Sequence, residues 1–274
     1  MNTPLTRIIH CSDIHFGHGH RPECSAALLS RVRELNPDAV IVSGDLTMRA
    51  RGGQFARAEE WLKQLPTPVM VIPGNHDIPL YNLALRLTNP FRNYRRFAEP
   101  HSTNPIELPC LRAIGINTIN PHRHQQGIID GVTRDRVCEW LTAQPQDAWR
   151  LVVIHQHVKD IPGHHRPGAI PGARETLEAW ARAGAHAVLH GHIHFDYAQT
   201  ADQLFPGFPV PMLVIAAGTG SNARTRGKAG TTNSFHLVEF SQEKLEISTQ
   251  RWNSMSGRFE ADQPVVFPRS LFSN

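Results

Sequence analysis

The sequence contains few cysteines, no long apolar segment and no block of like charges. Cys11, Cys24, Cys110 and Cys138 lie too far apart for a C-x-x-C metal or redox motif, and a chain of 274 residues does not need a disulfide framework. No stretch holds the roughly 20 apolar residues that cross a bilayer, and the N-terminus lacks the apolar core of a signal peptide. We therefore expect reduced cysteines, no membrane span and a cytoplasmic chain that begins near Met1.

The charge balance is close to even. Lys and Arg total 28 and Asp and Glu total 24, which gives a formal net charge of +4. Because the basic residues do not gather into an arm, a nucleic-acid partner is not expected. Hydrophobic residues make up 40% of the chain, which is enough to bury a large core. We predict one domain over residues 1–274.

Short apolar runs alternate with amphipathic segments along the first two thirds of the chain. The runs are rich in Val, Ile and Leu without strict alternation, which is typical of strands covered on both faces; they are residues 6–12, 39–43, 69–72, 151–155 and 187–190. The segments between them repeat apolar residues every three or four positions, as helices do; they are residues 25–36, 53–65, 133–144 and 173–184. Three further apolar runs after Val210 predict neighbouring strands. We therefore expect an α/β fold of two packed mixed β-sheets flanked by helices.

Each of the five predicted core strands is followed at its carboxyl end by residues of metal-binding type. They are Asp13 and His15; Asp45; Asn75, His76 and Asp77; His155 and His157; and His192 and His194. In open α/β sheets this edge is where ligands bind. Residues two apart in an extended chain point to the same side, so each Asp-x-His or His-x-His pair should face one centre. Gly44, Gly74 and Gly191 would permit the sharp turn or close approach before each ligand. Each piece alone fits an ordinary turn, whereas five in order predict a site.

Taken in order, the motifs Asp-x-His, Gly-Asp, Gly-Asn-His-Asp, His and Gly-His-x-His resemble those of the calcineurin-like metallophosphoesterases over residues 13–194. The resemblance implies an αββα sandwich that binds two divalent metal ions. It implies that one ion is held by Asp13, His15, Asp45 and His194, and the other by Asp45, Asn75, His155 and His192. Asp45 would bridge the two ions, and His76 would touch the substrate.

The chemistry of these residue types suits a two-metal hydrolase. Two cations about 3.5–4 Å apart can each bind a phosphate oxygen and activate a bridging hydroxide that attacks phosphorus. A shared carboxylate offsets the repulsion between the ions, and Asp45 is the best candidate for it. His76 can protonate or hydrogen-bond the leaving oxygen, while Asp77 either orients the His76 ring or turns the chain. Imidazole and carboxylate ligands suit Mn, Fe, Zn or Co alike.

The identity of one ligand and of the substrate is less constrained. His155 and His157 are alternative candidates for the same metal ligand, and His155 is favoured because it is the first of the two at the end of the strand. Protein phosphatases of the superfamily follow Gly-Asp with Val-Asp-Arg-Gly, whereas this chain reads GDLTMRARG. The short sequences GDLT and PGNHD resemble the corresponding motifs of the bacterial cyclic-nucleotide phosphodiesterase branch. We predict a phosphodiesterase for cyclic nucleotides or similar small diesters, with the loops 157–171 and 218–228 as candidate substrate contacts. The alternatives are a pyrophosphatase of a nucleotide-sugar lipid of the lipid A type, a nuclease, and a metal-binding scaffold without turnover.

Overall fold

The computed structural model describes residues 5–160, 168–225 and 232–272. Its strands are β1 (Thr6–Cys11), β2 (Ala39–Val42), β3 (Val69–Val71), β4 (Ile106–Leu108), β5 (Leu111–Gly115), β6 (Trp149–Val153), β7 (Ala187–His190), β8 (Tyr197–Thr200), β9 (Leu213–Ala216), β10 (Ser234–Phe240), β11 (Lys244–Asn253), β12 (Arg258–Ala261) and β13 (Val265–Pro268). The α-helices are α1 (Pro22–Leu35), α2 (Gly52–Leu62), α3 (Leu83–Thr88), α4 (Arg92–Phe97), α5 (Gly131–Thr142), α6 (Ala173–Arg182) and α7 (Ala201–Leu204). Short 3-10 helices are η1 (Asn75–Asp77), η2 (Glu99–His101) and η3 (Arg269–Phe272).

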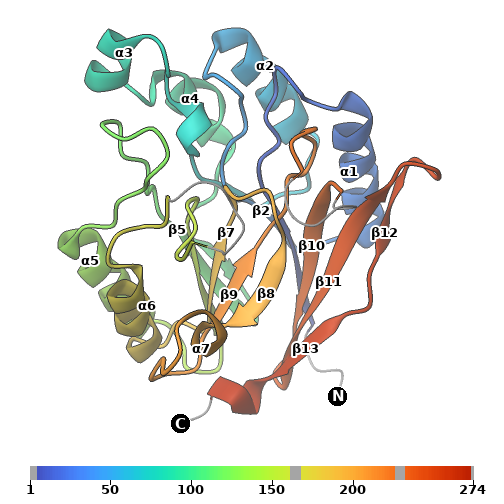
Figure 1. Cartoon of the computed structure of the whole chain (residues 1–274). Coiled ribbons are helices and arrows are strands. Elements are labelled where there is room, and N and C mark those ends of the chain that lie inside the picture. Colours follow the sequence, from blue (N-terminus) through green and yellow to red (C-terminus); the bar gives the residue numbers. More distant parts are fainter. Residues whose placement is uncertain (1–4, 161–167, 226–231, 273–274) are drawn as a thin grey trace.

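The strands form two mixed sheets with helices on their outer faces (Figure 1). The first sheet has the order β12–β11–β10–β1–β2–β3, and β13 pairs with β11. The second sheet has the order β4–β5–β6–β7–β9–β8. In the first sheet β10 runs antiparallel to β1, while β1, β2 and β3 are parallel neighbours. The predicted fold class is confirmed.

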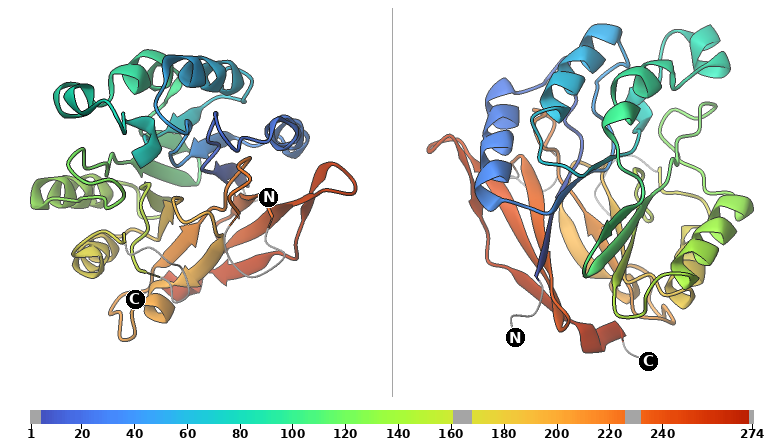
Figure 2. Two further views of the ribbon diagram at one scale, coloured as in Figure 1. Left: turned by 45° about the horizontal axis from the view of Figure 1, so that its top comes forward. Right: turned by 180° about the vertical axis from the view of Figure 1, so that it is seen from behind.

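Alternate residues of the central strands pack on opposite faces of each sheet. In β1, Ile8 belongs to the core between the sheets, whereas Ile9 packs with residues of α1 and α2. In β6, Leu151 lies between the sheets and Val152 packs with residues of α5 and α6. Because both faces are covered, these strands are apolar throughout. The layers are therefore helix, sheet, sheet and helix, as the two views of Figure 2 show.

Several predicted ends shift by a few residues. Helix α1 begins at Pro22 rather than at residue 25, since proline fits the first turn, where its missing N–H costs no hydrogen bond. Helix α5 begins at Gly131 because the Asp130 side chain accepts a hydrogen bond from the Thr133 N–H at 2.7 Å. Within the described part of the chain, no helix is long and apolar enough to cross a bilayer.

Candidate metal centre

Most of the predicted ligands have left-handed backbone conformation. The φ angle is 56° at Asp13, 54° at His15, 54° at Asp45, 72° at His192 and 57° at His194. The extended geometry predicted for the Asp-x-His and His-x-His pairs is therefore wrong. A left-handed turn at each residue, rather than the alternation of a strand, brings Asp13 and His15 into one ligand group and directs His192 and His194 into two different groups. This conformation costs a non-glycine residue roughly 1–2 kcal/mol, and such strain is typical of functional sites.

Two glycines allow the backbone to approach the ligands closely. A Cβ atom at Gly191 would collide with Ser12 Oγ and lie 2.6 Å from Asp13 Oδ2. Gly44 has a φ of 104°, and a Cβ atom there would collide with the His155 ring. A larger residue at either position would displace a ligand, which explains why glycine precedes these turns.

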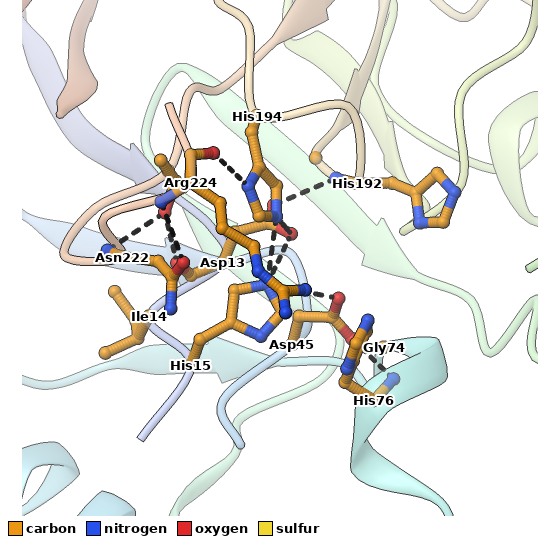
Figure 3. A network of polar contacts seen from close by, with 12 residues as sticks. Asp13, Ile14, His15, Asp45, Gly74, His76, His192, His194, Asn222 and Arg224 are labelled. Carbon is orange, nitrogen blue, oxygen red and sulfur yellow. Dashed lines mark hydrogen bonds and ion pairs between the residues drawn. The ribbon is translucent and has the colours of Figure 1, made fainter. Parts of the chain in front are cut away.

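The first ligand group brings together Asp13, His15 and His194 (Figure 3). The Nε2 atoms of the two rings lie 2.9 Å apart. Asp13 Oδ1 lies 3.1 Å from Nε2 of His194 and 3.4 Å from Nε2 of His15. All three side chains are buried. Residues from the carboxyl ends of β1 and β7, one strand from each sheet, therefore converge on one point.

The second ligand group contains Asp45, His155 and His192, with Asn75 beside them. Asn75 Oδ1 lies 2.9 Å from His192 Nδ1 and 3.2 Å from His155 Nε2. These two ring nitrogens are 3.3 Å apart. The Asn75 amide nitrogen donates to the His124 carbonyl at 3.2 Å, which turns the amide oxygen toward the rings. The amide oxygen therefore faces the two ring nitrogens of this group.

Asp45 joins the two groups. Its Oδ2 atom lies 3.5 Å from His15 Nε2 in the first group and 3.4 Å from His155 Nε2 in the second. Its Oδ1 atom accepts a hydrogen bond from the backbone N–H of His76 at 2.8 Å. Asp45 therefore lies between the two groups, where its negative charge would offset the repulsion between two close cations.

Two of the histidines carry the ring proton on the nitrogen that faces away from the ligand group. His155 Nδ1 donates to the Ser43 carbonyl at 2.8 Å, and His194 Nδ1 donates to the Arg224 carbonyl at 2.7 Å. A neutral ring with its proton on Nδ1 carries a bare lone pair on Nε2. Facing lone pairs, such as those of His15 and His194 at 2.9 Å, repel each other unless a cation or a proton lies between them. The arrangement fits a divalent cation in each group.

The carboxylates fit the same interpretation. Asp13 Oδ1 is buried and accepts no hydrogen bond from the described residues. Burial raises the pKa of Asp13 and of Asp45, but the neighbouring histidines outweigh it and hold both pKa values below the usual range. Both carboxyl groups are therefore anionic, as metal ligands of this type need to be. Imidazole, carboxylate and amide oxygen together suit Mn, Fe, Zn or Co.

His76 lies beside the ligand groups without belonging to either. Its ring is edge-on to that of His15, with centroids 4.8 Å apart. Its Nδ1 atom has two neighbours, the Met48 carbonyl at 2.9 Å and Arg49 Nη1 at 3.0 Å. The carbonyl needs a protonated Nδ1 and the guanidinium needs an unprotonated one, so the two contacts select opposite tautomers. Burial lowers the pKa of His76 to about 4.

Asp77 holds the backbone of the Asp45 turn. Its Oδ1 atom accepts from the Thr47 N–H at 2.8 Å and the Thr47 hydroxyl at 2.9 Å. Its Oδ2 atom accepts from the Leu46 N–H at 3.1 Å and the Gly74 N–H at 2.9 Å. Burial and the charge of Asp45 raise the pKa of Asp77 to about 6. Of the two roles considered for this residue, these contacts favour turning the chain over orienting the His76 ring.

The rival ligand and the two predicted substrate loops lie around this centre. His157 Nε2 lies 2.9 Å from Asp160 Oδ1, and the His157 ring stacks on His192 at 5.4 Å. The structure thus places His155 in the second group and His157 outside it. Part of the loop 157–171 and part of the loop 218–228 lie outside the described residues. Within the described part, the Arg224 carbonyl orients His194, and Figure 3 shows the Arg224 side chain extending toward the ligands.

Sequence reasoning missed three contributors to the site. Arg49 was not singled out, although it follows the Gly-Asp motif by four residues and contacts His76. The His124 carbonyl positions Asn75, and the Thr47 backbone and hydroxyl bind Asp77. Contacts of backbone carbonyls cannot be recognised from a sequence, whereas a basic residue four positions after a metal motif is a signal that could have been used.

Comparison with known proteins agrees with the geometry. The model of the calcineurin-like phosphoesterase family matches residues 6–196. A probable cyclic nucleotide phosphodiesterase of Synechococcus is 26% identical over 179 residues, which are 64% of this chain and 65% of that protein. A glycerophosphodiester phosphodiesterase of Enterobacter lignolyticus is 36% identical over 172 residues, 57% of each chain. The matched stretch thus spans less than two thirds of either curated relative.

Solved structures show the same fold. A dimetal phosphatase from Danio rerio superposes with a TM-score of 0.64 at 12% identity. The superposition covers 97% of this chain and 99% of the Danio rerio chain. A purple acid phosphatase from yellow lupin superposes with a TM-score of 0.73 at 12% identity. The superposition covers 100% of this chain and 56% of the lupin chain. The ligand groups, the matching family model and the shared fold together show that the chain belongs to the calcineurin-like phosphoesterase family.

Proposed function

We propose that the chain is a two-metal phosphoester hydrolase that cleaves small phosphodiesters, cyclic nucleotides among them. The observation that carries the proposal is the pair of ligand groups joined by Asp45 Oδ2, with His76 next to them. Family membership supports a metal-dependent phosphoester hydrolase, and the relatives named as cyclic nucleotide and glycerophosphodiester phosphodiesterases support a diester substrate.

In this proposal Asp13, His15 and His194 hold one ion, His155, His192 and Asn75 hold the other, and Asp45 is shared. When bound, two divalent ions polarise the phosphoryl oxygens and lower the pKa of a water molecule. The protein supplies the geometry: the left-handed turns aim the ligands, and the carbonyl contacts of the outer ring nitrogens fix their tautomers.

His76 acts on the leaving oxygen. When Arg49 donates to Nδ1, the ring proton lies on Nε2, the nitrogen that is free to donate to substrate. When Nδ1 donates to the Met48 carbonyl, Nε2 carries a proton only in the imidazolium form. Only the Arg49-bound tautomer and the imidazolium present an Nε2–H to the substrate, and proton donation to a leaving alkoxide typically contributes ~10²–10⁴-fold in rate. Arg49 is a positioning residue in this account.

The charge of the site favours diesters. A diester carries one negative charge at the reacting phosphorus and a monoester carries two. Beside the ligand groups lies the His76 ring, which is neutral at pH 7 because burial lowers its pKa to about 4. Of the two arginines nearby, Arg49 is already engaged by the Met48 carbonyl, and Arg224 extends toward the ligands in Figure 3. One cation that is not engaged by the protein matches the single charge of a diester better than the two charges of a monoester.

A paired substrate assay tests the proposal. With Mn²⁺ fixed, kcat/KM should be higher for bis(p-nitrophenyl) phosphate than for p-nitrophenyl phosphate. A panel of cyclic AMP, a glycerophosphodiester, single-stranded DNA and a nucleotide-sugar lipid then distinguishes the alternatives. A preference of tenfold or more for the monoester, on the order of 1.4 kcal/mol in transition-state energy, would contradict the diesterase assignment. A metal-loaded protein without turnover of any substrate would indicate a scaffold.

A further inference from the structure

A second pocket lies at the opposite end of the sheets from the metal centre. Its volume is about 410 Å³, and its lining includes Arg150, Arg182 and Arg269 together with His186. We call it the basal pocket. Arg150 lies at the start of β6, whereas the ligand His155 follows the far end of that strand, so at about 3.3 Å per residue the two sites are roughly 16 Å apart. Figure 1 shows the red turn η3, which begins with Arg269, at the foot of the sheets beside the C-terminus.

Arg150 has hydrogen-bonding capacity that the protein does not use. Its guanidinium packs against Gly184, where φ is 99° and a Cβ atom would lie 2.6 Å from Cζ, so glycine is needed to leave room for it. The Arg150 Nε atom is buried and has no hydrogen-bond partner among residues 5–160, 168–225 and 232–272. A buried donor without a partner is unfavourable. This N–H gains a partner when an acceptor enters the pocket and the guanidinium turns toward it.

The other cationic and polar groups of the pocket are fixed around this arginine. His186 Nδ1 accepts the Arg150 backbone N–H at 3.0 Å, so the neutral ring carries its proton on Nε2 and is a donor. Arg269 Nη2 donates to the Gln146 carbonyl at 3.0 Å, and its guanidinium carbon lies 4.9 Å from the centre of the Trp149 ring. These contacts hold the Arg269 guanidinium in place and leave its remaining N–H groups for a ligand.

The positive charges of the pocket are not balanced within its wall. No acidic side chain is among the described residues that line it. Two acidic groups outside the lining face its arginines: the charge of Asp147 acts on Arg269, and Glu178 lies 3.9 Å from the Arg182 guanidinium, whose side chain is 61% exposed. Burial and the charge of Arg269 lower the pKa of Arg150. Burial, and then the two arginines, lower the pKa of His186 to about 3. An anion would relieve this repulsion.

We propose that the basal pocket binds the phosphate group of a small molecule. Arg150 Nε, the Arg269 and Arg182 guanidinium groups and His186 Nε2 are donors from four side chains, which suits a tetrahedral anion with several oxygens better than a planar carboxylate. The volume accommodates inorganic phosphate or a phosphomonoester such as a nucleoside monophosphate. The site is independent of the metal centre and does not depend on the proposed hydrolase activity.

The buried Arg150 Nε–H provides a local readout. In ¹H–¹⁵N spectra of the Zn²⁺-loaded protein its signal is identified by its loss in Arg150→Lys. Titration with inorganic phosphate should shift this signal saturably, and chloride at the same ionic strength should not. A second arm with adenosine monophosphate shows whether a nucleoside adds affinity to the phosphate. A third arm with malonate should bind at least tenfold more weakly than phosphate.

Matched variants locate the site. Arg269→Gln should weaken phosphate binding about tenfold or more, because one charge-assisted hydrogen bond is lost. Arg258→Gln, an exposed arginine of β12, makes the same change in net charge and should leave the affinity unchanged. As a second readout, phosphate should raise the Tm of the wild type more than that of Arg269→Gln. Phosphate binding at the metal centre would raise the Tm of both proteins equally, so it does not contribute to the difference. An Arg150 Nε–H signal that responds equally to phosphate and chloride, or an equal rise in Tm in both proteins, would overturn the proposal.

Discussion

Replacing Asp77 by asparagine tests whether this buried carboxylate maintains the Asp45 turn. The two Asp77 oxygens accept hydrogen bonds from the N–H and hydroxyl of Thr47 and from the N–H groups of Leu46 and Gly74, at 2.8–3.1 Å. Asparagine has nearly the same size but only one acceptor oxygen. Its amide nitrogen must therefore face one pair of these donors, and two buried donors lose their acceptor.

The expected loss of stability follows from the two buried donors that lose their acceptor. An unsatisfied buried donor costs about 1–3 kcal/mol, so Asp77→Asn should lower the free energy of unfolding by about 2–6 kcal/mol. For a chain of this size about 1 kcal/mol corresponds to roughly 2–4 °C, so the Tm should fall by at least about 4 °C. Because Asp45 follows Gly44 in the same turn, kcat should fall as well.

Thermal unfolding followed by circular dichroism, with and without bound metal, measures this effect. Asp130→Asn is the matched control: Asp130 is an exposed N-cap that accepts one hydrogen bond, and asparagine is an equally good N-cap. The control should keep the wild-type Tm. If Asp77→Asn unfolds at the same temperature as the control, the four hydrogen bonds do not support the turn and our interpretation of Asp77 is wrong.

Three further variants probe the centre. Asp45→Ala should lose both ions and all activity, because the cations then repel each other without a bridge; full metal occupancy by elemental analysis would place the bridge elsewhere. His76→Ala should keep two ions while kcat falls ~10²-fold or more. This loss should be smaller for a nitrophenyl ester than for an alkyl ester, and equal losses would rule out proton donation. Arg49→Met should lower kcat in the same leaving-group-dependent way, without changing metal content; an unchanged kcat would show that the Arg49 contact with His76 has no catalytic role.

Much of the fold was predictable because its core strands are covered on both faces. Strands such as β2 and β7 are short, wholly buried and apolar, and polar residues follow them directly. Other strands give weaker signals. Strand β8 is half-buried along its length, and β12 is mostly exposed, so neither shows a clear apolar pattern.

The ligand residues were predictable from their types and order, whereas their geometry was not. The sequence places Asp13 two residues before His15, but it does not reveal that both adopt left-handed backbone. That conformation is imposed by tertiary contacts, for example the hydrogen bonds from the backbone N–H groups of Asp13 and His15 to the carbonyls of Gly44 and Asp45. Likewise, Asp77 could not be assigned to the turn until its acceptor contacts were known.

Metal titration of the metal-free protein tests the central claim most directly. Mn²⁺ is added while the number of bound ions and the turnover of bis(p-nitrophenyl) phosphate are measured on the same samples. We predict two ions per chain, with turnover that follows occupancy of the second site, because both ligand groups share Asp45. A stoichiometry of one ion at full activity, or turnover that persists in the metal-free protein, would contradict a two-metal mechanism.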